Sequence, residues 1–411
     1  MRTMTDTHFM RLALRLARRG YGMTSPNPMV GAVLVKGGNI IGRGWHRHAG
    51  GPHAEIEALR DAQQHGHPAK GATLYVTLEP CCTHGRTPPC TDAIIAAGIK
   101  RVIIGATDPN PKHAGKGLKI LKRAGIAVVK IGASRGDGRA AQRAIPTKIG
   151  GSRWRSPHQI LADECQRLNE AFNHWIVHRT PFVTVKAAMP LDGKTATASG
   201  ESKWITGEKA RTHGMKLRQG ADAILVGINT ILADDPSLTF RTDARSKENI
   251  KHPKLRRMVL DSMARTPLKA KVVSDKHAAL TTVVVSKRAP KNRVTALARR
   301  VNVVVAPAAK PLSPATRHLS LIDLRWLMRK LGAENVTSLL VEGGGEVNAS
   351  FLLGGLAQRV AFFYAPKVLG GRDSRKAVAG EGVRSLAEVI RLRDVEWKRI
   401  GSDLLLTARV G

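Results

Sequence analysis

The amino-acid sequence predicts two α/β domains in one chain. Strand-like apolar runs alternate with helical patterns through residues 30–132, and a second series of strand-like runs fills the later part of the chain. Between them, residues 132–158 are rich in Gly, Arg and Ser and lack apolar periodicity, which is typical of a flexible linker or insertion. Alternating strands and helices build layered α/β folds. We therefore expect one domain at residues 1–178 and another at residues 179–411.

The first series begins with a helix. Phe9, Leu12 and Leu16 recur at helical spacing, so we interpret the Arg-rich N-terminus as part of the domain, with a transit peptide as the alternative. Pro52 precedes a second helical pattern that starts at His53, and proline suits the opening of a helix. The other expected elements are strands at residues 30–36, 71–80, 100–109 and 126–132, and helices at residues 91–98 and 115–125.

The second series starts after a long helical pattern at residues 159–178. No internal repeat is visible, and no low-complexity tract apart from the linker. Strands are expected at residues 182–189, 223–227, 257–261, 281–286, 302–306, 338–343 and 359–366.

Charge and composition limit the classes of function. The net charge of +36 suggests a protein that binds polyanions, but Lys and Arg are spread along the whole chain and aromatic residues make up only 4%. We therefore expect a generally basic surface that favours phosphorylated substrates. The 42% apolar content is typical of soluble proteins, and no apolar run reaches membrane-spanning length. Cysteines are too few, at four, for a secreted disulfide framework.

Three of the four cysteines lie in the stretch LEPCCTHGRTPPC, residues 78–90. In the preceding stretch PHAEIEALR, His53 and Glu55 both fall in the first helical turn and could reach one point beyond the helix end. One imidazole and two thiolates give zinc three protein ligands and leave a position for water, whose pKa the metal lowers. Glu55, outside the coordination shell, could take the proton of that water and pass it to a leaving amine.

Simpler interpretations hold for the neighbouring residues. A lone His-x-Glu is usually part of a surface helix, and only its combination with the clustered cysteines favours a metal site. Adjacent residues point to different sides, so we expect only one of Cys81 and Cys82 to face the metal and the other to be a packing residue or a bystander. Cys165 is expected to be a buried helical cysteine. The remaining histidines of this region are expected to be solvated, namely His48, His65 and His67.

The motif HAE followed by EPCCTHGRTPPC resembles the deaminase half of the bifunctional riboflavin-biosynthesis deaminase/reductase family, as do NPMVGAVLV and GWHRHAGGPHAE. The resemblance implies a cytidine-deaminase-like, three-layer α/β/α domain. The zinc ligands that it implies are His53, Cys81 and Cys90, with Glu55 as the proton shuttle. The substrate contacts that it implies are Asn27 and His46 to the pyrimidine and Arg86 to the phosphate. The chain departs from the family at Cys82-Thr83, where members commonly have Ser-His.

Three stretches of the second domain resemble the reductase half of the same family: KAAMPLDGKTATASGESKWIT, LRQGADAILVGINTILADDPSLTFR and LLVEGGGEVNASFL. The resemblance implies a dihydrofolate-reductase-like α/β fold that uses NADPH. The glycines of the last stretch could bring backbone N–H groups close to a phosphate, although a purely structural turn has the same pattern. One departure is Pro190, where many members have Ser or Thr.

The resemblance also implies the binding residues of this domain. Those for NADPH are Ala188, Trp204, Thr230, Asp234, Ser262, Gly344, Gly345, Glu346, Val347, Asn348, Ala349 and Ser350. Those for the ribose-phosphate substrate are Lys186, Ser202, Arg218, Leu238, Arg241 and Glu342, with Lys186 also a candidate acid. Taken without the resemblance, Arg218 and Arg241 would be solvated surface charges, Trp204 a core residue and Asp234 a turn residue.

These observations predict a bifunctional enzyme of riboflavin synthesis. We expect hydrolytic deamination of 2,5-diamino-6-(5-phosphoribosylamino)pyrimidin-4(3H)-one to 5-amino-6-(5-phosphoribosylamino)uracil, followed by NADPH-dependent reduction of the ribosyl to the ribityl side chain. The enzyme is expected to need Zn²⁺ and NADPH, to be cytoplasmic and homo-oligomeric, and to bind neither a membrane nor a specific nucleic acid. Two alternatives stay open, a nucleic-acid-editing zinc deaminase and a zinc-stabilised basic binding protein without turnover.

Overall fold

The computed structural model of the chain describes residues 5–84, 88–132, 156–240, 255–309 and 322–411. The chain divides into two compact units, Met1–His178 and Arg179–Gly411. Arg86, Arg241 and nearly all of the expected linker at residues 132–158 lie outside the described residues. Within the described ranges, no helix is long and apolar enough to cross a membrane.

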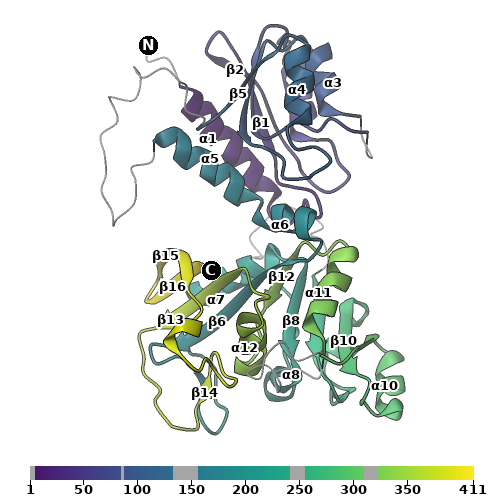
Figure 1. Ribbon diagram of the computed structural model, residues 1–411, viewed down its shortest axis with the longest axis vertical. Helices are drawn as coiled ribbons and strands as arrows, with labels where there is room; N and C mark the ends of the chain where they lie inside the picture. The colour runs from purple at the N-terminus through teal and green to yellow at the C-terminus, as the bar shows by residue number, and fades with distance from the viewer. Residues whose placement is uncertain (1–4, 85–87, 133–155, 241–254, 310–321) are drawn as a thin grey trace. The chain divides into compact units, whose positions relative to one another are not determined.

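A mixed five-stranded sheet forms the centre of the first unit (Figure 1). Its strands are β1 (Gly31–Lys36), β2 (Asn39–Trp45), β3 (Thr73–Leu78), β4 (Arg101–Ala106) and β5 (Ala127–Lys130). Their order in the sheet is β2-β1-β3-β4-β5. Strand β1 is antiparallel to both of its neighbours, whereas β3, β4 and β5 are parallel to one another. The carboxyl ends of these parallel strands therefore lie along one edge.

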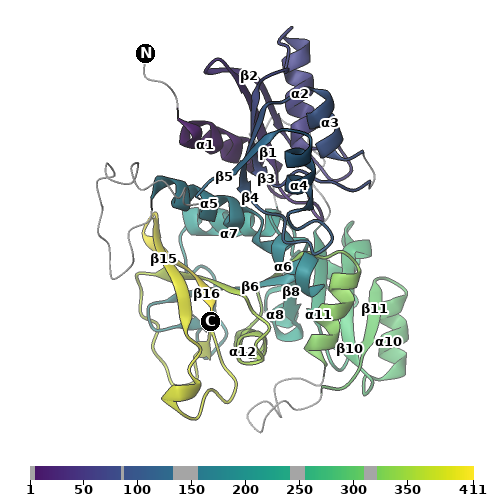
Figure 2. The same cartoon turned by 45° about the horizontal axis from the view of Figure 1, so that its top comes forward.

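Helices cover both faces of this sheet. They are α1 (Asp6–Ala17), α2 (Ala54–Gln64), α3 (Cys90–Ala96), α4 (Lys116–Arg123) and α5 (Pro157–Leu168). Because successive side chains of a strand point to opposite faces, Leu34 packs with α2, α3 and α4, whereas Val33 packs with α1 and α5. Figures 1 and 2 show these two helical layers on either side of the strands. The three-layer arrangement expected from the sequence is confirmed.

The helical pattern at residues 159–178 forms two helices, so the expectation of a single helix is wrong. Helix α5 ends at Leu168, and α6 (Glu170–His178) begins after Asn169. The Asn169 side chain accepts a hydrogen bond from the backbone N–H of Met29 at 2.7 Å and donates one to the Met29 carbonyl at 2.9 Å. A side-chain amide that serves a distant backbone segment favours an irregular backbone over a continuous helix.

The second unit is built on a nine-stranded sheet. Its strands are β6 (Phe182–Pro190), β8 (Ala223–Gly227), β9 (Arg256–Leu260), β10 (Thr281–Ser286), β11 (Asn302–Ala306), β12 (Ser338–Val341), β13 (Arg359–Ala365), β15 (Leu392–Ile400) and β16 (Asp403–Val410). Their order is β11-β10-β9-β8-β12-β6-β13-β16-β15. Neighbouring strands are parallel except for the two pairs that contain β16. A separate two-stranded sheet pairs β7 (Lys194–Ala196) with β14 (Arg375–Lys376).

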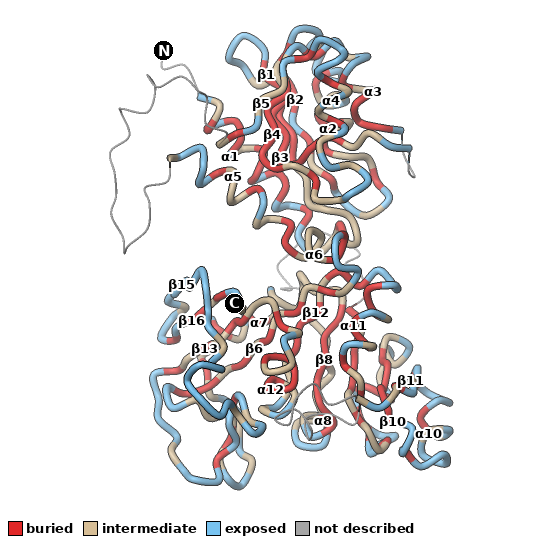
Figure 3. Tube along the Cα trace, in the orientation of Figure 1, coloured by how far each residue is buried: buried red, intermediate tan, exposed pale blue. Residues whose placement is uncertain are grey.

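The central parallel strands β8, β10 and β12 are buried on both faces, as Figure 3 shows, whereas the edge strand β11 is partly exposed. Leu225 packs with α11 and α12 on one face, and Val226 packs with α8, α9 and α10 on the other. Helix α7 packs on β13 and β16 through Ala210. The helices of the unit are α7 (Glu208–Gln219), α8 (Ile228–Asp234), α9 (Lys271–Ser274), α10 (Lys291–Ala298), α11 (Leu324–Ala333) and α12 (Gly345–Leu353).

All seven strands expected in the second unit are present, but two further long strands were not predicted. Strand β15 reads LRDVEWKRI, and most of its residues are charged and exposed, so it shows neither an apolar run nor a buried face. It forms a strand because it pairs antiparallel with β16. In the first unit β2 was missed, because glycines interrupt its short apolar pattern, NIIGRGW.

Candidate active sites

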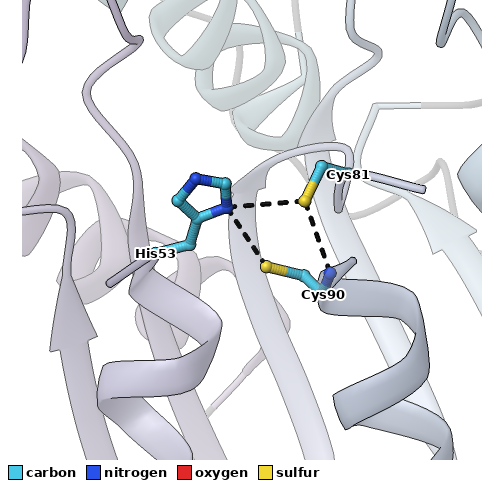
Figure 4. Close-up of side chains that lie close together, drawn as sticks. All are labelled: His53, Cys81 and Cys90. Carbon is cyan, nitrogen blue, oxygen red and sulfur yellow. Dashed lines mark hydrogen bonds between the residues drawn. The ribbon is translucent and has the colours of Figure 1, made fainter. Parts of the chain in front are cut away.

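The structure brings His53, Cys81 and Cys90 together from three segments of the first unit. His53 is the residue before the first turn of α2, Cys81 follows the carboxyl end of β3, and the buried Cys90 begins α3. The His53 Nδ1 atom lies 3.4 Å from the Cys81 Sγ atom and 3.3 Å from the Cys90 Sγ atom. Figure 4 shows all three side chains pointing toward one another.

These three atoms fit a zinc ion. They all lie within 4.8 Å of one another, and no other group of three or more His, Cys, Asp or Glu side chains in the described ranges is arranged in this way. A tetrahedral zinc ion with its usual bond lengths separates a nitrogen ligand from a sulfur ligand by about 3.6 Å. Hydrogen bonding by Cys90 outweighs burial and, together with His53, lowers the pKa of Cys81 to about 4, which favours the thiolate that metals bind.

Glu55 lies in the first turn of α2 and is buried. Burial, reinforced by the negative charge of Cys81, raises the pKa of Glu55 to about 7. A carboxyl group with a pKa near the working pH can both take and return a proton. The structure therefore places a suitable acid–base group beside the three possible metal ligands.

Asn27 and His46 also meet beside this cluster. The His46 Nδ1 atom lies 2.9 Å from the Pro52 carbonyl, to which it donates, so its Nε2 atom is left to accept from the Asn27 amide at 3.2 Å. Burial lowers the pKa of His46, which favours the neutral ring. The rings of His46 and His53 stack edge to face, with centroids 5.4 Å apart. Both predicted pyrimidine contacts thus lie next to the predicted metal ligand.

The remaining cysteines and three of the histidines were expected to lie outside the metal site. Cys165 is buried in α5, and the side chains of His48, His65 and His67 are exposed. The Cys82 Sγ atom lies 3.7 Å from the Nδ1 atom of His113, and Cys82 is not one of the three side chains whose ligand atoms gather within the described ranges. The predicted phosphate contact, Arg86, lies outside the described residues.

The second unit contains a cavity of about 990 Å³, a volume within the range of small-molecule sites. Eight of the residues predicted to bind NADPH or substrate line it: Ser202, Thr230, Asp234, Glu342, Gly344, Gly345, Glu346 and Val347. Further lining residues that the sequence did not predict include Thr195, Asn229, Arg375 and Lys376. Thr195 and Asn229 fall inside the quoted motifs, whereas nothing in the sequence around Arg375 and Lys376 indicated a site.

The start of α12 forms one wall of this cavity and suits a phosphate group. Gly344 precedes the helix, and a Cβ atom added there would meet nothing within 4 Å. The neighbouring glycine is tightly packed, since a Cβ atom on Gly345 would lie 2.3 Å from the Lys376 carbonyl oxygen. The open glycine, the helix N-terminus and the basic Arg375 and Lys376 together fit the anionic phosphates of a dinucleotide.

Several residues assigned to NADPH or substrate do not line the cavity. Asn348, Ala349 and Ser350 are buried within α12; the Asn348 amide donates to the Ala377 carbonyl, and its Oδ1 atom has no partner in the described structure. Trp204 is 67% exposed rather than part of the core, and Arg211 lies over its ring. Also absent from the lining are Ala188 on β6, Leu238 in the apolar core and Ser262, whose carbonyl accepts from Ser286, together with the charged Lys186 and Arg218.

Arg218, Lys186 and Glu342 form a charge cluster at the edge of the cavity. Arg218 makes two hydrogen bonds to the Glu342 carboxylate, at 2.9 and 2.8 Å, and the Lys186 Nζ atom lies 3.6 Å from the same carboxylate. Burial alone would raise the pKa of Glu342, but the charges of Lys186 and Arg218 outweigh it and lower the pKa to about 2. Arg218, with 15% of its side chain exposed, is therefore a largely covered, paired residue rather than a solvated surface charge.

Two family models match the chain. The model described as the cytidine and deoxycytidylate deaminase zinc-binding region matches residues 3–106, and that of the RibD C-terminal domain matches residues 181–406. The riboflavin biosynthesis protein RibD of Actinobacillus pleuropneumoniae is 39% identical over 405 residues, which cover 98% of this chain and 95% of that protein. The Escherichia coli protein of the same name is 37% identical, and the match covers 98% of this chain and 99% of that one.

Solved structures agree with these matches. The structure of Acinetobacter baumannii RibD superposes with a TM-score of 0.78 at 33% identity, covering 99% of both chains. That of a diaminohydroxyphosphoribosylaminopyrimidine deaminase/5-amino-6-(5-phosphoribosylamino)uracil reductase from Thermotoga maritima superposes with a TM-score of 0.73 at 32% identity, again covering 99% of both chains.

Fold, sites and relatives together define a bifunctional enzyme in which a zinc-dependent deaminase is joined to a reductase. The first unit has the cytidine-deaminase-like fold, and the second has the dihydrofolate-reductase-like fold of the reductase half. The chain belongs to the RibD family of riboflavin-biosynthesis deaminase/reductases. Its cofactors are zinc for the deaminase and NADPH for the reductase. The expected family, fold class, double activity and cofactors are confirmed.

Proposed function

We propose that the unit Met1–His178 deaminates 2,5-diamino-6-(5-phosphoribosylamino)pyrimidin-4(3H)-one, and that the unit Arg179–Gly411 then reduces the ribosyl group of the product to ribityl. The observation that carries this proposal is the convergence of His53, Cys81 and Cys90 beside the buried Glu55. The name of the Thermotoga maritima relative supports the same pair of substrates.

In the proposed deamination, His53, Cys81 and Cys90 hold the zinc ion. When bound, zinc supplies Lewis acidity and lowers the pKa of a coordinated water. Glu55 takes a proton from the attacking water and delivers it to the departing amine, so that water and substrate become the uracil product and ammonia. Asn27 and His46 bind and orient the pyrimidine, since their paired ring nitrogen and amide lie beside His53. Arg86 is proposed to contact the phosphate by resemblance alone.

In the proposed reduction, the cavity lined by Thr230, Asp234 and residues 343–347 holds NADPH, which supplies the hydride when bound. Lys186, Arg218 and Glu342 hold the ribose phosphate, with Lys186 as the candidate proton donor. Lys186 is proposed for that role because its ammonium group is partly exposed and lies 3.6 Å from the Glu342 carboxylate, which lines the cavity. The remaining binding residues are proposed by resemblance: for NADPH, Ala188, Trp204, Ser262, Asn348, Ala349 and Ser350; for substrate, Ser202, Leu238 and Arg241.

We further propose that the enzyme is cytoplasmic and forms a homo-oligomer. The thiols of Cys81 and Cys90 must stay reduced to hold a metal, which favours a reducing compartment. Strand β15 is the last strand in the sheet order, and between its charged residues it exposes 47% of Val395 and 59% of Trp397, so its open backbone edge and these two side chains can contact another chain. Light scattering that gives only the 44.4 kDa of one chain would contradict the oligomer.

A single assay tests the main proposal. Purified enzyme, the diaminopyrimidinone and NADPH are mixed, and ammonia release and NADPH oxidation are followed together. We expect ammonia to appear first and NADPH oxidation to depend on it. Turnover of cytidine in single-stranded nucleic acid without turnover of the pyrimidine would support the editing alternative. Zinc binding without any turnover would support a binding protein.

A further inference from the structure

The buried Glu79 joins two segments of the first unit. It follows β3 and is separated from Cys81 only by Pro80. One oxygen of its carboxyl group, Oε2, accepts hydrogen bonds from the backbone N–H groups of Asp108 at 3.2 Å and Gly115 at 3.0 Å. The other oxygen, Oε1, accepts from the backbone N–H group of Gly117 at 3.1 Å. One side chain thus holds both ends of residues 108–117.

Residues 108–117 are held by hydrogen bonds within the segment and contact the residues that follow β3. The Asp108 carboxylate accepts a hydrogen bond from the backbone N–H group of Asn110 at 2.8 Å. The backbone N–H group of His113 donates to the Asn110 carbonyl, also at 2.8 Å. The His113 ring then contacts Cys82 and Thr83. The hydrogen bonds within the segment and its contacts with Glu79, Cys82 and Thr83 therefore fix its position relative to the residues that follow β3.

Gly117 lies against the backbone of Pro80, just before Cys81. A Cβ atom at this position would lie 2.4 Å from the Pro80 carbonyl oxygen. Since Pro80 and Cys81 share that peptide group, Gly117 packs directly on the backbone that carries the proposed zinc ligand. Only glycine allows this contact without displacing one of the two segments.

We infer that Glu79 and Gly117 form a backbone lock that positions Cys81 for zinc, so that Glu79 is a positioning residue of the deaminase. The Glu79 carboxyl group holds the 108–117 segment by three hydrogen bonds, and Gly117 lets the segment pack closely on the Pro80–Cys81 peptide. The lock fixes the direction in which Cys81 presents its sulfur to His53. Residues that orient metal ligands in this way typically change metal affinity by about 10–100-fold when they are replaced.

The substitution Glu79→Gln tests the lock with little change in shape. An amide has one acceptor oxygen, so Gln can keep the two bonds at the Oε2 position but must set an N–H donor against the N–H of Gly117. Gly117→Ala disturbs the same contact from the other side. Glu164→Gln is the matched control, because Glu164 is half-exposed on α5 and its ion pair with Arg18 lies at the surface.

The measurement is the zinc dissociation constant of the zinc-stripped full-length enzyme, obtained by competition with a chromophoric chelator, together with the visible spectrum of the cobalt-substituted enzyme. We expect Glu79→Gln and Gly117→Ala to weaken zinc binding about 10–100-fold and to alter the cobalt bands. Glu164→Gln should match wild type. NADPH oxidation, which takes place in the other unit, should be unchanged in all three variants.

The lock is overturned if both variants bind zinc as tightly as wild type and give the same cobalt spectrum. It is also overturned if both variants lose the cooperative unfolding of the zinc-free first unit, because Glu79 would then serve folding rather than positioning. The inference rests on the proposed zinc ligands. A wild-type chain that fails to bind one zinc ion would refute those ligands, whereas wild-type binding with unaffected variants refutes only the lock.

Discussion

Two adjacent cysteines, Cys81 and Cys82, have different surroundings. The Cys81 Sγ atom accepts the backbone N–H of Cys90 at 3.3 Å and lies beside His53, whereas the Cys82 sulfur faces His113. The difference arises because neighbouring residues of an extended backbone point to opposite sides. Only one cysteine of the pair can therefore share a metal ion with His53.

Cys81→Ser should lose most of its zinc, because a serine hydroxyl does not replace a thiolate ligand at neutral pH. Cys82→Ser should keep one zinc ion per chain. The metal content of the two purified variants, measured by mass spectrometry of the metal, checks this prediction. Zinc loss in the Cys82 variant alone would show that the ligand is assigned to the wrong cysteine.

Glu55→Gln should slow ammonia release by about 10²–10⁴-fold, the usual contribution of general acid–base catalysis. Glutamine keeps the size of the buried side chain but cannot accept a proton from water. Zinc content should stay at the wild-type level, since Glu55 is outside the proposed ligand set. NADPH oxidation, measured with separately supplied deaminated intermediate, should stay near wild type. A variant with wild-type ammonia release would remove Glu55 from the mechanism.

At the scale of single elements, Asn169 lies at the break between α5 and α6 and bonds the backbone of the segment that carries Asn27. The Asn169 side chain satisfies both the N–H and the carbonyl of Met29, two residues beyond Asn27. Because a backbone group without a partner costs about 1–3 kcal/mol when it is buried, this one amide stabilises the backbone beside Asn27, the proposed pyrimidine contact.

Asn169→Ala should therefore destabilise the first unit by about 1–3 kcal/mol and raise the KM for the pyrimidine. Urea unfolding of the first unit and steady-state ammonia release are the measurements. Gln166→Ala is the control, because Gln166 is exposed on α5 and its side chain serves no distant backbone. Equal stability of the Asn169 and Gln166 variants would contradict the structural role of the amide.

In the second unit, Glu342 follows β12 and balances the charges of Lys186 and Arg218. Glu342→Gln removes the only carboxylate described in that cluster and leaves two cations facing each other. Breaking a buried pair from one side costs about 3–5 kcal/mol. We expect a loss of that order in urea unfolding of the second unit. Glu334→Gln, at a more exposed ion pair with Arg256, should cost no more than about 1 kcal/mol.

The same carboxylate predicts a pH dependence. The folded-state pKa of Glu342 is lowered to about 2 from an ordinary value of 4.5, so its contribution to stability is present above pH 4.5 and is lost as the pH falls toward 2. Wild-type enzyme should therefore lose more stability in that window than Glu342→Gln does. Parallel pH profiles of the two proteins would show that Glu342 is not the titrating group.

At the scale of the whole molecule, each proposed site lies within one compact unit. The zinc cluster and its neighbours come from residues of Met1–His178, and the cavity is lined only by residues of Arg179–Gly411. We expect residues 1–178 and 179–411, expressed as separate proteins, to perform deamination and reduction respectively. Ammonia release by the first and NADPH oxidation by the second are the measurements. Loss of both activities in folded fragments would show that each site needs the other unit.

The zinc cluster was predictable from the sequence because its chemistry is local and its residue types are rare. His53 and Glu55 share one helical turn, and the cysteines fall within thirteen residues, 78–90. The cofactor cavity was predictable only in part. Arg375 and Lys376 reach it because β14 pairs with β7 across nearly two hundred residues of chain, a separation that no local pattern records. Asn348 fell within a motif, yet it does not line the cavity, and its buried amide donates to the Ala377 carbonyl.

By itself the sequence determined the α/β class, the family and the zinc chemistry, since these depend on periodicity and on clustered Cys, His and Glu. The tertiary structure decided which residues meet. It pairs Arg218 with Glu342 and breaks a helical pattern at Asn169 to satisfy Met29. It also pairs β15, a strand of mostly charged residues, with β16. The physical reason is the same in each case, because hydrogen-bonding and charged groups are satisfied by partners far along the chain, and local patterns carry no information about those partners.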